Sequence, residues 1–439
     1  MRKTILTTIS IFMLTGALMA QNVTKASIES AEKMYGLNFN DAKRDSMTDI
    51  LSKNIKTYDF LHSRNFKNEV PLPLAFNVDL PGLVVPKKQL PVHFNIPANV
   101  ELPKNINDLA FYSIPQLASL MKNKKISSEK LTRFYLDRLK KYGPVLHCVI
   151  ELTDTIAIAQ AKKADADLAK GIYHGPLHGI PYGIKDLFSV KGTHTTWGTP
   201  PYKDQIIDET CFVARKLQAA GAVLVAKLSL GELAEDDVWF GGLTRNPWDI
   251  NKGSGGSSAG SSSATAAGLV PFAIGTETYG SIVDPSMRCG VTGLRPTYGS
   301  IARTGAMALC WTSDKVGPIC RSAEEDAIVF NYIHGTDKKD ASAIDFAFNY
   351  TGSVDIKKLK IAYVKNYIDT LPDNSTEKQT LVTLKKMGAT VTGITLPDNL
   401  HGDETLSLIV GVESAAAFDV LSTFWCAQQH LLPKWWYGR

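Results

Sequence analysis

Residues 255–261 read GGSSAGS and residues 275–281 read GTETYGS. Both stretches combine glycine with small hydroxyl side chains, and an apolar run at residues 269–274 precedes the second one. A lysine, Lys185, lies upstream in the stretch GIPYGIKD, residues 179–186. Small residues let the backbone pass close to neighbouring groups and adopt dihedral angles that larger residues resist. The two loops and the lysine therefore predict a packed functional site.

A glycine- and serine-rich run is usually a flexible linker. The flanks of residues 255–261 argue against that interpretation. Residues 244–248 (TRNPW) predict an ordered turn before the run, and residues 264–268 (ATAAG) continue it into a packed helix and a strand. We therefore interpret the run as part of a site.

Two other catalytic motifs match the chain, and we interpret both as chance matches. Residues 256–260 fit the Gly-x-Ser-x-Gly turn of α/β-hydrolases, with Ser258 as the nucleophile. That turn needs an apolar strand directly before it, and residues 248–253 (WDINKG) are too polar to form one. Ser127 and Lys130 fit the Ser-x-x-Lys signature of penicillin-binding enzymes, but they start a predicted helix and no Lys-Thr-Gly partner occurs.

The remaining pattern predicts an α/β protein. Helical periodicity occurs in residues 24–63 and in parts of 113–168, and residues 222–226 and 270–274 read as buried strands. Residues 358–396 predict a strand–helix–strand unit. Alternation of this kind predicts a mixed, largely parallel sheet covered by helices on both faces.

Composition is that of an ordinary globular protein. The chain has 439 residues, 44% of them hydrophobic and 21% charged, with a formal net charge of +5. This charge is too mild and too dispersed to predict a nucleic-acid partner or binding to an anionic membrane. The six cysteines include no Cys-x-x-Cys pair and no histidine at metal-ligand spacing, so buried thiols are expected and no metal site is predicted.

Four segments are expected along the chain. Residues 1–20 look like a secretory signal peptide, which predicts export to the periplasm or the medium and no stable membrane anchor. Residues 21–105 predict a helical and proline-rich arm. The main α/β part is expected over residues 106–419, and residues 420–439 form an aromatic tail of doubtful structure.

From about residue 110 to 335 the chain resembles the amidase signature family, in its peptide-amidase-like branch. The two serine loops carry this resemblance together with further motifs in the same order: residues 175–181 (GPLHGIP), 219–223 (AAGAV), 244–247 (TRNP), 290–297 (GVTGLRPT) and 317–318 (GP). The resemblance implies the amidase signature fold and hydrolysis of a carboxamide C–N bond through an acyl-serine intermediate. It also implies a small-molecule or peptide amide as substrate, and no cofactor or metal.

The resemblance implies a Ser–cisSer–Lys triad. Lys185 matches the base of the family, and Ser257 matches the serine that follows a cis peptide bond. Ser281, 24 residues further on, matches the nucleophile. The implied oxyanion hole consists of the backbone N–H groups of four successive residues, namely Thr278, Tyr279, Gly280 and Ser281. Successive amides in a turn can stabilise developing negative charge.

The residue types themselves suit these roles. A serine hydroxyl is a poor nucleophile until a neighbour takes its proton, and no histidine lies near Ser257 or Ser281 in the sequence. A lysine can take the proton only while its amine is neutral, and burial lowers a lysine pKa in that direction. The apolar neighbours Ile184 and Leu187 predict a buried Lys185 within hydrogen-bonding reach of Ser257, which would relay the proton.

The chain also departs from the family. Many members have glycine where Tyr279 stands and arginine where Val283 stands, so Tyr279 predicts a narrowed substrate entry. Members usually continue beyond the position of Asp419 with elements that complete the sheet, so we expect a truncated chain of marginal stability. The alternative function is therefore a catalytically impaired relative with a binding or vestigial role. Members that pass ammonia to charged tRNA work in the cytoplasm with partner subunits, and the export signal argues against that role.

Overall fold

The structure is a computed structural model that describes three ranges of the chain: residues 23–63, 86–397 and 402–421. The expected signal peptide at residues 1–20 and nearly all of the expected tail at residues 420–439 lie outside these ranges. The chain divides into two compact units. One consists of Met1–Val70 together with Val420–Arg439, and the other of Pro71–Asp419.

The described part of the first unit contains two helices, α1 (Lys25–Tyr35) and α2 (Asp41–Ser63). They account for the helical periodicity of residues 24–63. Glu32 of α1 and Arg44 of α2 form an ion pair with 2.9 Å between Oε2 and Nη2. The Glu32 side chain is only 4% exposed, so this pair joins the two helices on their inner faces.

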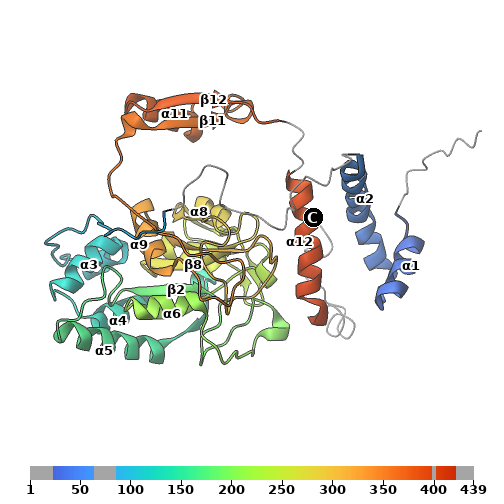
Figure 1. The fold of residues 1–439 in the computed structure, drawn as a ribbon. Helices are drawn as coiled ribbons and strands as arrows, with labels where there is room; N and C mark the ends of the chain where they lie inside the picture. Colours follow the sequence, from blue (N-terminus) through green and yellow to red (C-terminus); the bar gives the residue numbers. More distant parts are fainter. Residues whose placement is uncertain (1–22, 64–85, 398–401, 422–439) are drawn as a thin grey trace, which may run out of the picture. The chain divides into compact units, whose positions relative to one another are not determined.

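The second unit is built on a six-stranded sheet (Figure 1). Its strands are β1 (Val149–Leu152), β2 (Pro181–Lys185), β3 (Val223–Leu228), β8 (Phe272–Glu277), β9 (Thr292–Gly293) and β10 (Lys315–Cys320), in the spatial order β1-β3-β2-β8-β10-β9. The central strand β2 pairs in parallel with β3 and with β8, and the remaining pairs are antiparallel. Every residue of β2 and β3 is buried, as is typical of parallel strands covered on both faces. The expected mixed α/β class is confirmed, with parallel pairing at the centre of the sheet.

Helices flank this sheet (Figure 1). They are α3 (Ile114–Lys122), α4 (Ser128–Leu146), α5 (Asp154–Ala169), α6 (Phe212–Ala219), α7 (Ala259–Ala266), α8 (Val283–Cys289) and α9 (Ala323–Ile333). Leucines of α4 and alanines of α5 and α7 pack with β3 and β8 in one buried apolar cluster. Ser127 is the N-cap of α4, and its hydroxyl accepts a hydrogen bond from the Lys130 N–H at 3.1 Å. The Ser-x-x-Lys match is therefore a helix cap.

Short elements connect these helices and strands. The 3₁₀ helices are η1 (Ile106–Phe111), η2 (Pro200–Tyr202), η3 (Glu232–Ala234) and η4 (Ile356–Lys358). Two small hairpins precede the first serine loop: β4 (Val238–Trp239) with β5 (Gly242–Leu243), and β6 (Arg245–Asn246) with β7 (Asp249–Gly253).

Strand β7 is not the apolar strand of a hydrolase elbow. The sequence of residues 248–253 is too polar for such a strand, and Asp249–Gly253 instead pairs antiparallel with β6 in a small hairpin. A two-stranded hairpin tolerates polar side chains because its faces stay open to water, and the middle three residues of β7 are exposed. Strand β7 therefore does not supply the apolar strand that a hydrolase elbow at Ser258 would need.

The expected strand–helix–strand unit is also present, as β11 (Lys360–Val364), α11 (Thr376–Lys386) and β12 (Thr390–Ile394), with the short helix α10 (Lys365–Ile368) after β11. The two strands are parallel, but they form a separate sheet instead of joining the six-stranded one. Every side chain of β11 and β12 is at least partly exposed, in contrast to the buried central strands. The described chain continues with α12 (Gly402–Ala417).

Two further observations concern the described ranges. None of their helices combines the length and the apolar character that crossing a membrane requires. Their five cysteines are free and buried, as the sequence predicted: Cys148, Cys211, Cys289, Cys310 and Cys320. Cys426 lies outside the described residues.

Candidate active site

Lys185 is the last residue of β2, at the carboxyl end of the central parallel strands, and its side chain is 0% exposed. Ligands of open α/β sheets bind outside the carboxyl ends of such strands. The strand places Lys185 there because the apolar residues around it bury β2 between β3 and β8. The burial expected from Ile184 and Leu187 is thus observed.

The Lys185 amine contacts only uncharged groups. Its Nζ lies 2.8 Å from Ser257 Oγ, 3.1 Å from Ser258 Oγ and 2.9 Å from Thr276 Oγ1, with the Thr276 carbonyl oxygen at 3.4 Å. The hydrogen bond to Ser257 is the contact that the sequence predicted.

Burial lowers the pKa of Lys185 to about 7, because the charged form loses its hydration and gains no ion-pair partner. The carboxylates of Asp314 and Glu277 act in the opposite direction, but more weakly. A large part of the Lys185 side chains is therefore neutral near pH 7, and a neutral amine can accept a proton from a hydroxyl.

The loop that carries Ser257 is held on both sides. The Gly256–Ser257 peptide bond is cis, as the resemblance implied. The Gly256 N–H donates to Asp284 Oδ2 at 3.2 Å, and the Gly255 N–H donates to Asp237 Oδ2 at 2.9 Å. A Cβ at Gly256 would lie 1.7 Å from a backbone carbonyl oxygen, so only glycine fits at that position.

Ser258 is placed differently from its neighbour Ser257. Its hydroxyl is fully buried, donates to the Thr276 carbonyl at 3.0 Å and accepts from the Thr276 N–H at 3.2 Å. Its third contact is the Lys185 amine. The Ser258 hydroxyl is thus buried and has its hydrogen bonds within the protein, which argues against the α/β-hydrolase interpretation.

Ser281 lies in the turn that follows β8, next to the first serine loop. Its carbonyl oxygen accepts a hydrogen bond from the Ser258 N–H at 3.0 Å, which joins the two loops. Its side chain is partly exposed, and its hydroxyl makes no hydrogen bond to another described residue. The structure therefore places the Ser281 backbone against the loop that contains Ser257, and the proton relay between the two hydroxyls stays a prediction.

Two buried carboxylates shape the turn before Ser281. Glu277 Oε2 accepts from the N–H groups of Ile282 and Val283 at 2.9 and 3.0 Å. Asp314 Oδ1 accepts from Thr278 Oγ1 at 2.5 Å. These contacts fix the turn at both ends, while its amides stay available. Within the described ranges, the N–H groups of residues 278–281 donate to no protein acceptor.

Tyr279 was expected to narrow the substrate entry. The residue is 52% exposed and precedes Ser281 by two positions, so the narrowing stays a prediction.

The sequence did not single out Thr276, Asp284 or Asp314 as site residues. Thr276 and Asp284 lie within or just after the motif GTETYGS, so their nearness to the serines was a usable signal. Asp314 is 33 residues beyond Ser281, and only the pairing of β10 with β8 brings it to Thr278.

The arrangement of lysine and serines coincides with a match to a known family. The family model described as Amidase matches residues 130–435. The chain belongs to the amidase family. Its six-stranded sheet and flanking helices form the amidase signature fold, which the solved peptide amidases also have.

Curated relatives of this amidase-family chain include A-type subunits of glutamyl-tRNA(Gln) amidotransferase. The one from Coxiella burnetii (strain RSA 493 / Nine Mile phase I) is 39% identical over 297 residues, which are 65% of this chain and 61% of that protein. The one from Geobacillus kaustophilus is 37% identical over 317 residues, covering 70% and 65%. The chain thus spans about three-fifths of the length of the curated relatives it matches.

Solved structures of amidase-family proteins are similar to this chain. The native peptide amidase from Stenotrophomonas maltophilia is 30% identical, with a TM-score of 0.63 over 71% of this chain and 68% of that one. A structure of the peptide amidase PAM with the competitive inhibitor chymostatin is 29% identical, with a TM-score of 0.64 over 73% and 69%.

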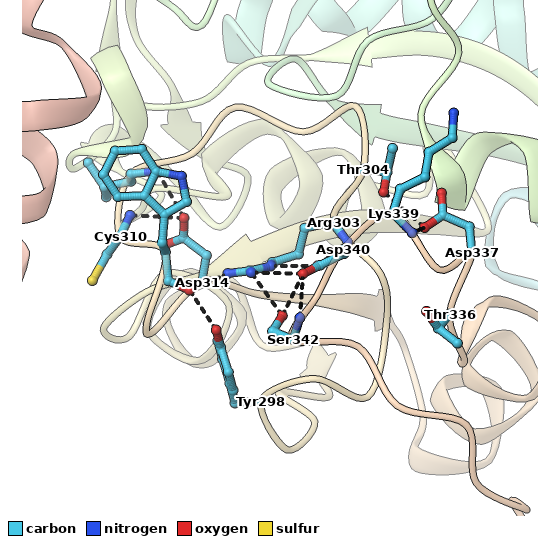
Figure 2. A network of polar contacts seen from close by, with 12 residues as sticks. Tyr298, Arg303, Thr304, Cys310, Asp314, Thr336, Asp337, Lys339, Asp340 and Ser342 are labelled. Carbon is cyan, nitrogen blue, oxygen red and sulfur yellow. Dashed lines mark hydrogen bonds and ion pairs between the residues drawn. The ribbon is translucent and has the colours of Figure 1, made fainter. Parts of the chain in front are cut away.

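A cavity of about 300 Å³ adjoins the candidate active site of this amidase-family chain. Thr276, which contacts the Lys185 amine, and Thr278, which begins the turn of free amides, both line it. Ser257 and Ser281 are not among its lining residues, so the cavity meets the candidate active site at Thr276 and Thr278. Figure 2 shows the polar network around Arg303 and Asp340, two residues that also line the cavity.

Proposed function

We propose that this protein hydrolyses the C–N bond of a carboxamide through an acyl-serine intermediate on Ser281. The observation that carries this proposal is the buried Lys185 amine, whose Nζ lies 2.8 Å from Ser257 Oγ and whose pKa burial lowers to about 7. A buried amine among hydroxyl groups is suited to accept a proton at neutral pH. Membership of the amidase family supports the same reaction class.

In the proposed first half-reaction, Ser281 Oγ attacks the carbonyl carbon of the amide. The Ser281 proton moves to the Ser257 hydroxyl while the Ser257 proton moves to neutral Lys185 Nζ. The N–H groups of residues 278–281 stabilise the oxyanion that forms on the carbonyl oxygen. The C–N bond then breaks, and the leaving nitrogen takes a proton back from Lys185 through Ser257. The products are the acyl-Ser281 ester and an amine or ammonia.

The second half-reaction repeats these proton transfers with water. A water molecule attacks the ester carbonyl and gives its proton to Lys185 through Ser257. The C–O bond to Ser281 breaks, Ser281 Oγ regains a proton, and a carboxylic acid leaves. No oxidant, reductant or metal takes part in these steps.

We further propose a small-molecule or peptide amide as the substrate. A peptide-like inhibitor, chymostatin, is bound in the solved peptide amidase named above, and that protein resembles 73% of this chain. Residues 1–20 support a reaction outside the cytoplasm, which argues against service within an amidotransferase complex like that of the curated relatives.

The test compares Ser281→Ala with Ser258→Ala in the full chain. We expect Ser281→Ala to abolish ammonia release from simple primary amides and to block labelling by a serine-directed fluorophosphonate. Ser258→Ala is the matched control, because its hydroxyl is buried and hydrogen-bonded. It should keep the label. Loss of the label in Ser258→Ala with retention in Ser281→Ala would contradict the assignment. Absence of both label and turnover in the wild type would favour a catalytically impaired relative.

A further inference from the structure

The cavity beside Thr276 and Thr278 has two kinds of wall. Its polar wall contains Arg303, Thr304, Lys339 and Asp340, together with Thr276, Thr278, Asp314 and Lys315. Its apolar wall is formed by Leu187, Ala234, Ala306, Met307, Ala308, Leu309, Trp311 and Val316. Its volume of about 300 Å³ is at the small end of ligand pockets. Such a cavity suits part of a small substrate.

The charges of Arg303 and Asp340 are paired with each other. Arg303 Nε and Nη2 donate to the Asp340 carboxylate at 2.9 and 3.1 Å, and Nη2 also donates to Ser342 Oγ at 2.8 Å (Figure 2). Its remaining nitrogen, Nη1, donates to the Trp311 carbonyl at 2.6 Å. These contacts use four of the five N–H donors of Arg303 and leave one N–H of Nη1, so the guanidinium cannot bind a ligand carboxylate through two nitrogens without giving up protein contacts.

The other charged groups of the lining are similarly occupied, with one exception. Asp314 Oδ2 accepts from the N–H groups of Leu309 and Cys310, both at 2.9 Å. Lys315 Nζ donates to the Thr278 carbonyl at 3.0 Å. Lys339 is exposed and makes no ion pair with a described residue. A solvated ammonium of this kind contributes little to binding, so apolar contact is the main attraction that the cavity offers.

Trp311 sits on a loop that is anchored at several points. Its carbonyl oxygen accepts from the Tyr298 hydroxyl at 2.6 Å as well as from Arg303. The next residue, Thr312, donates through its N–H and Oγ1 to Glu413 of α12, at 3.1 and 2.7 Å. The indole itself is 45% exposed and lines the cavity. Because hydrogen bonds fix the backbone around Trp311, its half-exposed indole provides a preorganised apolar wall.

We propose that this cavity is the acyl pocket and that it selects amides whose acyl group is apolar and of medium size, with Trp311 as the specificity-determining residue. The inference rests on the proposed function, because the acyl group would extend from Ser281 past Thr276 and Thr278. A polar acyl group would lose its water there and gain few partners, since most of the nearby donors and acceptors already have protein partners. An apolar group gains by leaving water.

The first experiment measures binding without turnover, using the full-length Ser281→Ala chain and calorimetry. The probes are straight-chain primary amides from acetamide to hexanamide, which share one leaving group. We expect the dissociation constant to fall about fourfold for each added methylene until the cavity is full. Equal dissociation constants across the series would overturn the inference.

The second experiment adds Trp311→Ala to the same chain. Hexanamide should then bind at least tenfold more weakly, whereas acetamide binding should hardly change, because only the longer chain reaches the indole. Trp311→Phe keeps an aromatic wall and should restore most of the affinity. Tyr367→Ala, at a ring of α10 that is 62% exposed, is the matched control and should have no effect. An unchanged hexanamide affinity in Trp311→Ala would contradict the role of this residue.

A third measurement tests charge recognition by Lys339. Succinamic acid carries a carboxylate at the far end of its acyl group. We expect it to bind more weakly than the neutral amide of equal length, with no change in Lys339→Gln. Tighter binding of succinamic acid that disappears in Lys339→Gln would overturn the apolar assignment.

These results separate the two proposals. Fluorophosphonate labelling of Ser281 and its loss in Ser281→Ala test the reaction alone. If Ser281 is labelled but acyl length and Trp311 have no influence on binding, the acyl-pocket inference fails and the proposed reaction stands. If binding follows acyl length but Ser281→Ala still hydrolyses amides, the proposed nucleophile fails and the pocket stands.

Discussion

Two buried lysines on neighbouring strands, Lys185 of β2 and Lys227 of β3, differ in their partners. Both side chains are 0% exposed. Lys227 Nζ lies 2.5 Å from Asp186 Oδ1 and also donates to the His194 carbonyl at 2.6 Å. Lys185 has hydroxyl and carbonyl partners only. The same residue type at the same depth is therefore an ion-pair partner in one strand and a candidate proton acceptor in the other.

Asp186 explains how this difference arises. It follows Lys185 directly in the sequence, but successive side chains in an extended chain point to opposite sides. Its carboxylate faces Lys227 and also accepts from the Thr196 N–H at 2.7 Å and Thr196 Oγ1 at 2.6 Å. The carboxylate nearest to Lys185 in sequence is thus committed elsewhere. Without a counter-ion, burial can lower the Lys185 pKa to about 7.

The largest expected effect comes from Lys185→Met. Turnover of a primary amide should fall about 10⁴-fold, because the proton acceptor is lost. The stability of the folded protein should increase although the activity falls. Keeping an amine of lowered pKa buried costs the folded state roughly 4 kcal/mol at pH 7, and the hydroxyls left without a partner offset part of that gain. We expect the free energy of unfolding in urea to rise by about 1–2 kcal/mol. A less stable and still active variant would contradict the comparison.

Lys227→Met should have the second-largest effect, on stability. Removing Lys227 leaves the Asp186 carboxylate buried without its ion-pair partner, which typically costs about 3–5 kcal/mol. The double variant Lys227→Met/Asp186→Asn should recover much of this loss, because it removes the uncompensated charge. Urea unfolding of the two variants measures the difference. If Lys227→Met were as stable as the wild type, the ion pair would not have the structural role assigned to it.

The pH dependence gives a third, smaller effect. Only the neutral Lys185 amine accepts a proton, so kcat/KM should rise about tenfold per pH unit up to about pH 7 and level off above it. Stability carries a matching signature. The folded-state pKa lies below the usual lysine value of 10.5, so between pH 7 and 10.5 the unfolded state binds more protons. The contribution of this group to stability must then increase with pH across that window, and Lys185→Met should remove the increase. A kcat/KM that stayed constant from pH 5 to 9 would exclude this amine as the base.

The smallest effect is expected for Ser258→Ala. Its hydroxyl lies 3.1 Å from Lys185 Nζ and orients the amine together with Thr276 Oγ1, which lies 2.9 Å from the same nitrogen. Removing one neutral hydrogen bond should lower kcat about tenfold and leave KM nearly unchanged. Ser258→Thr keeps a hydroxyl at this position and should recover part of the loss. A loss as large as that of Lys185→Met would mean that Ser258 takes part directly in proton transfer.

Several features of the fold and the site could be predicted from the sequence, because they depend on neighbours along the chain. The buried strand at Val223, the helix that begins after Ser113 and the buried Lys185 all follow from local apolar patterns and capping residues. The order of the amidase motifs made the contact between Lys185 and Ser257 predictable. The separate β11–β12 sheet was not predictable, because the sequence pattern of a strand does not indicate which other strand it pairs with.

The sequence by itself determined which residue types are available for chemistry: a lysine in an apolar strand, two serine loops rich in glycine, and a turn of small residues. Only the tertiary structure decided their partners. Because β2 lies parallel between β3 and β8, Asp186 forms an ion pair with Lys227, and the Lys185 amine contacts hydroxyl groups. Pairing of β10 with β8 brought Asp314 to Thr278, and the loop after residue 306 brought Trp311 to the cavity. The physical reason is that the electrostatic energy of a buried charge depends on the few atoms in contact with it. Those atoms come from strands that are far apart in the sequence.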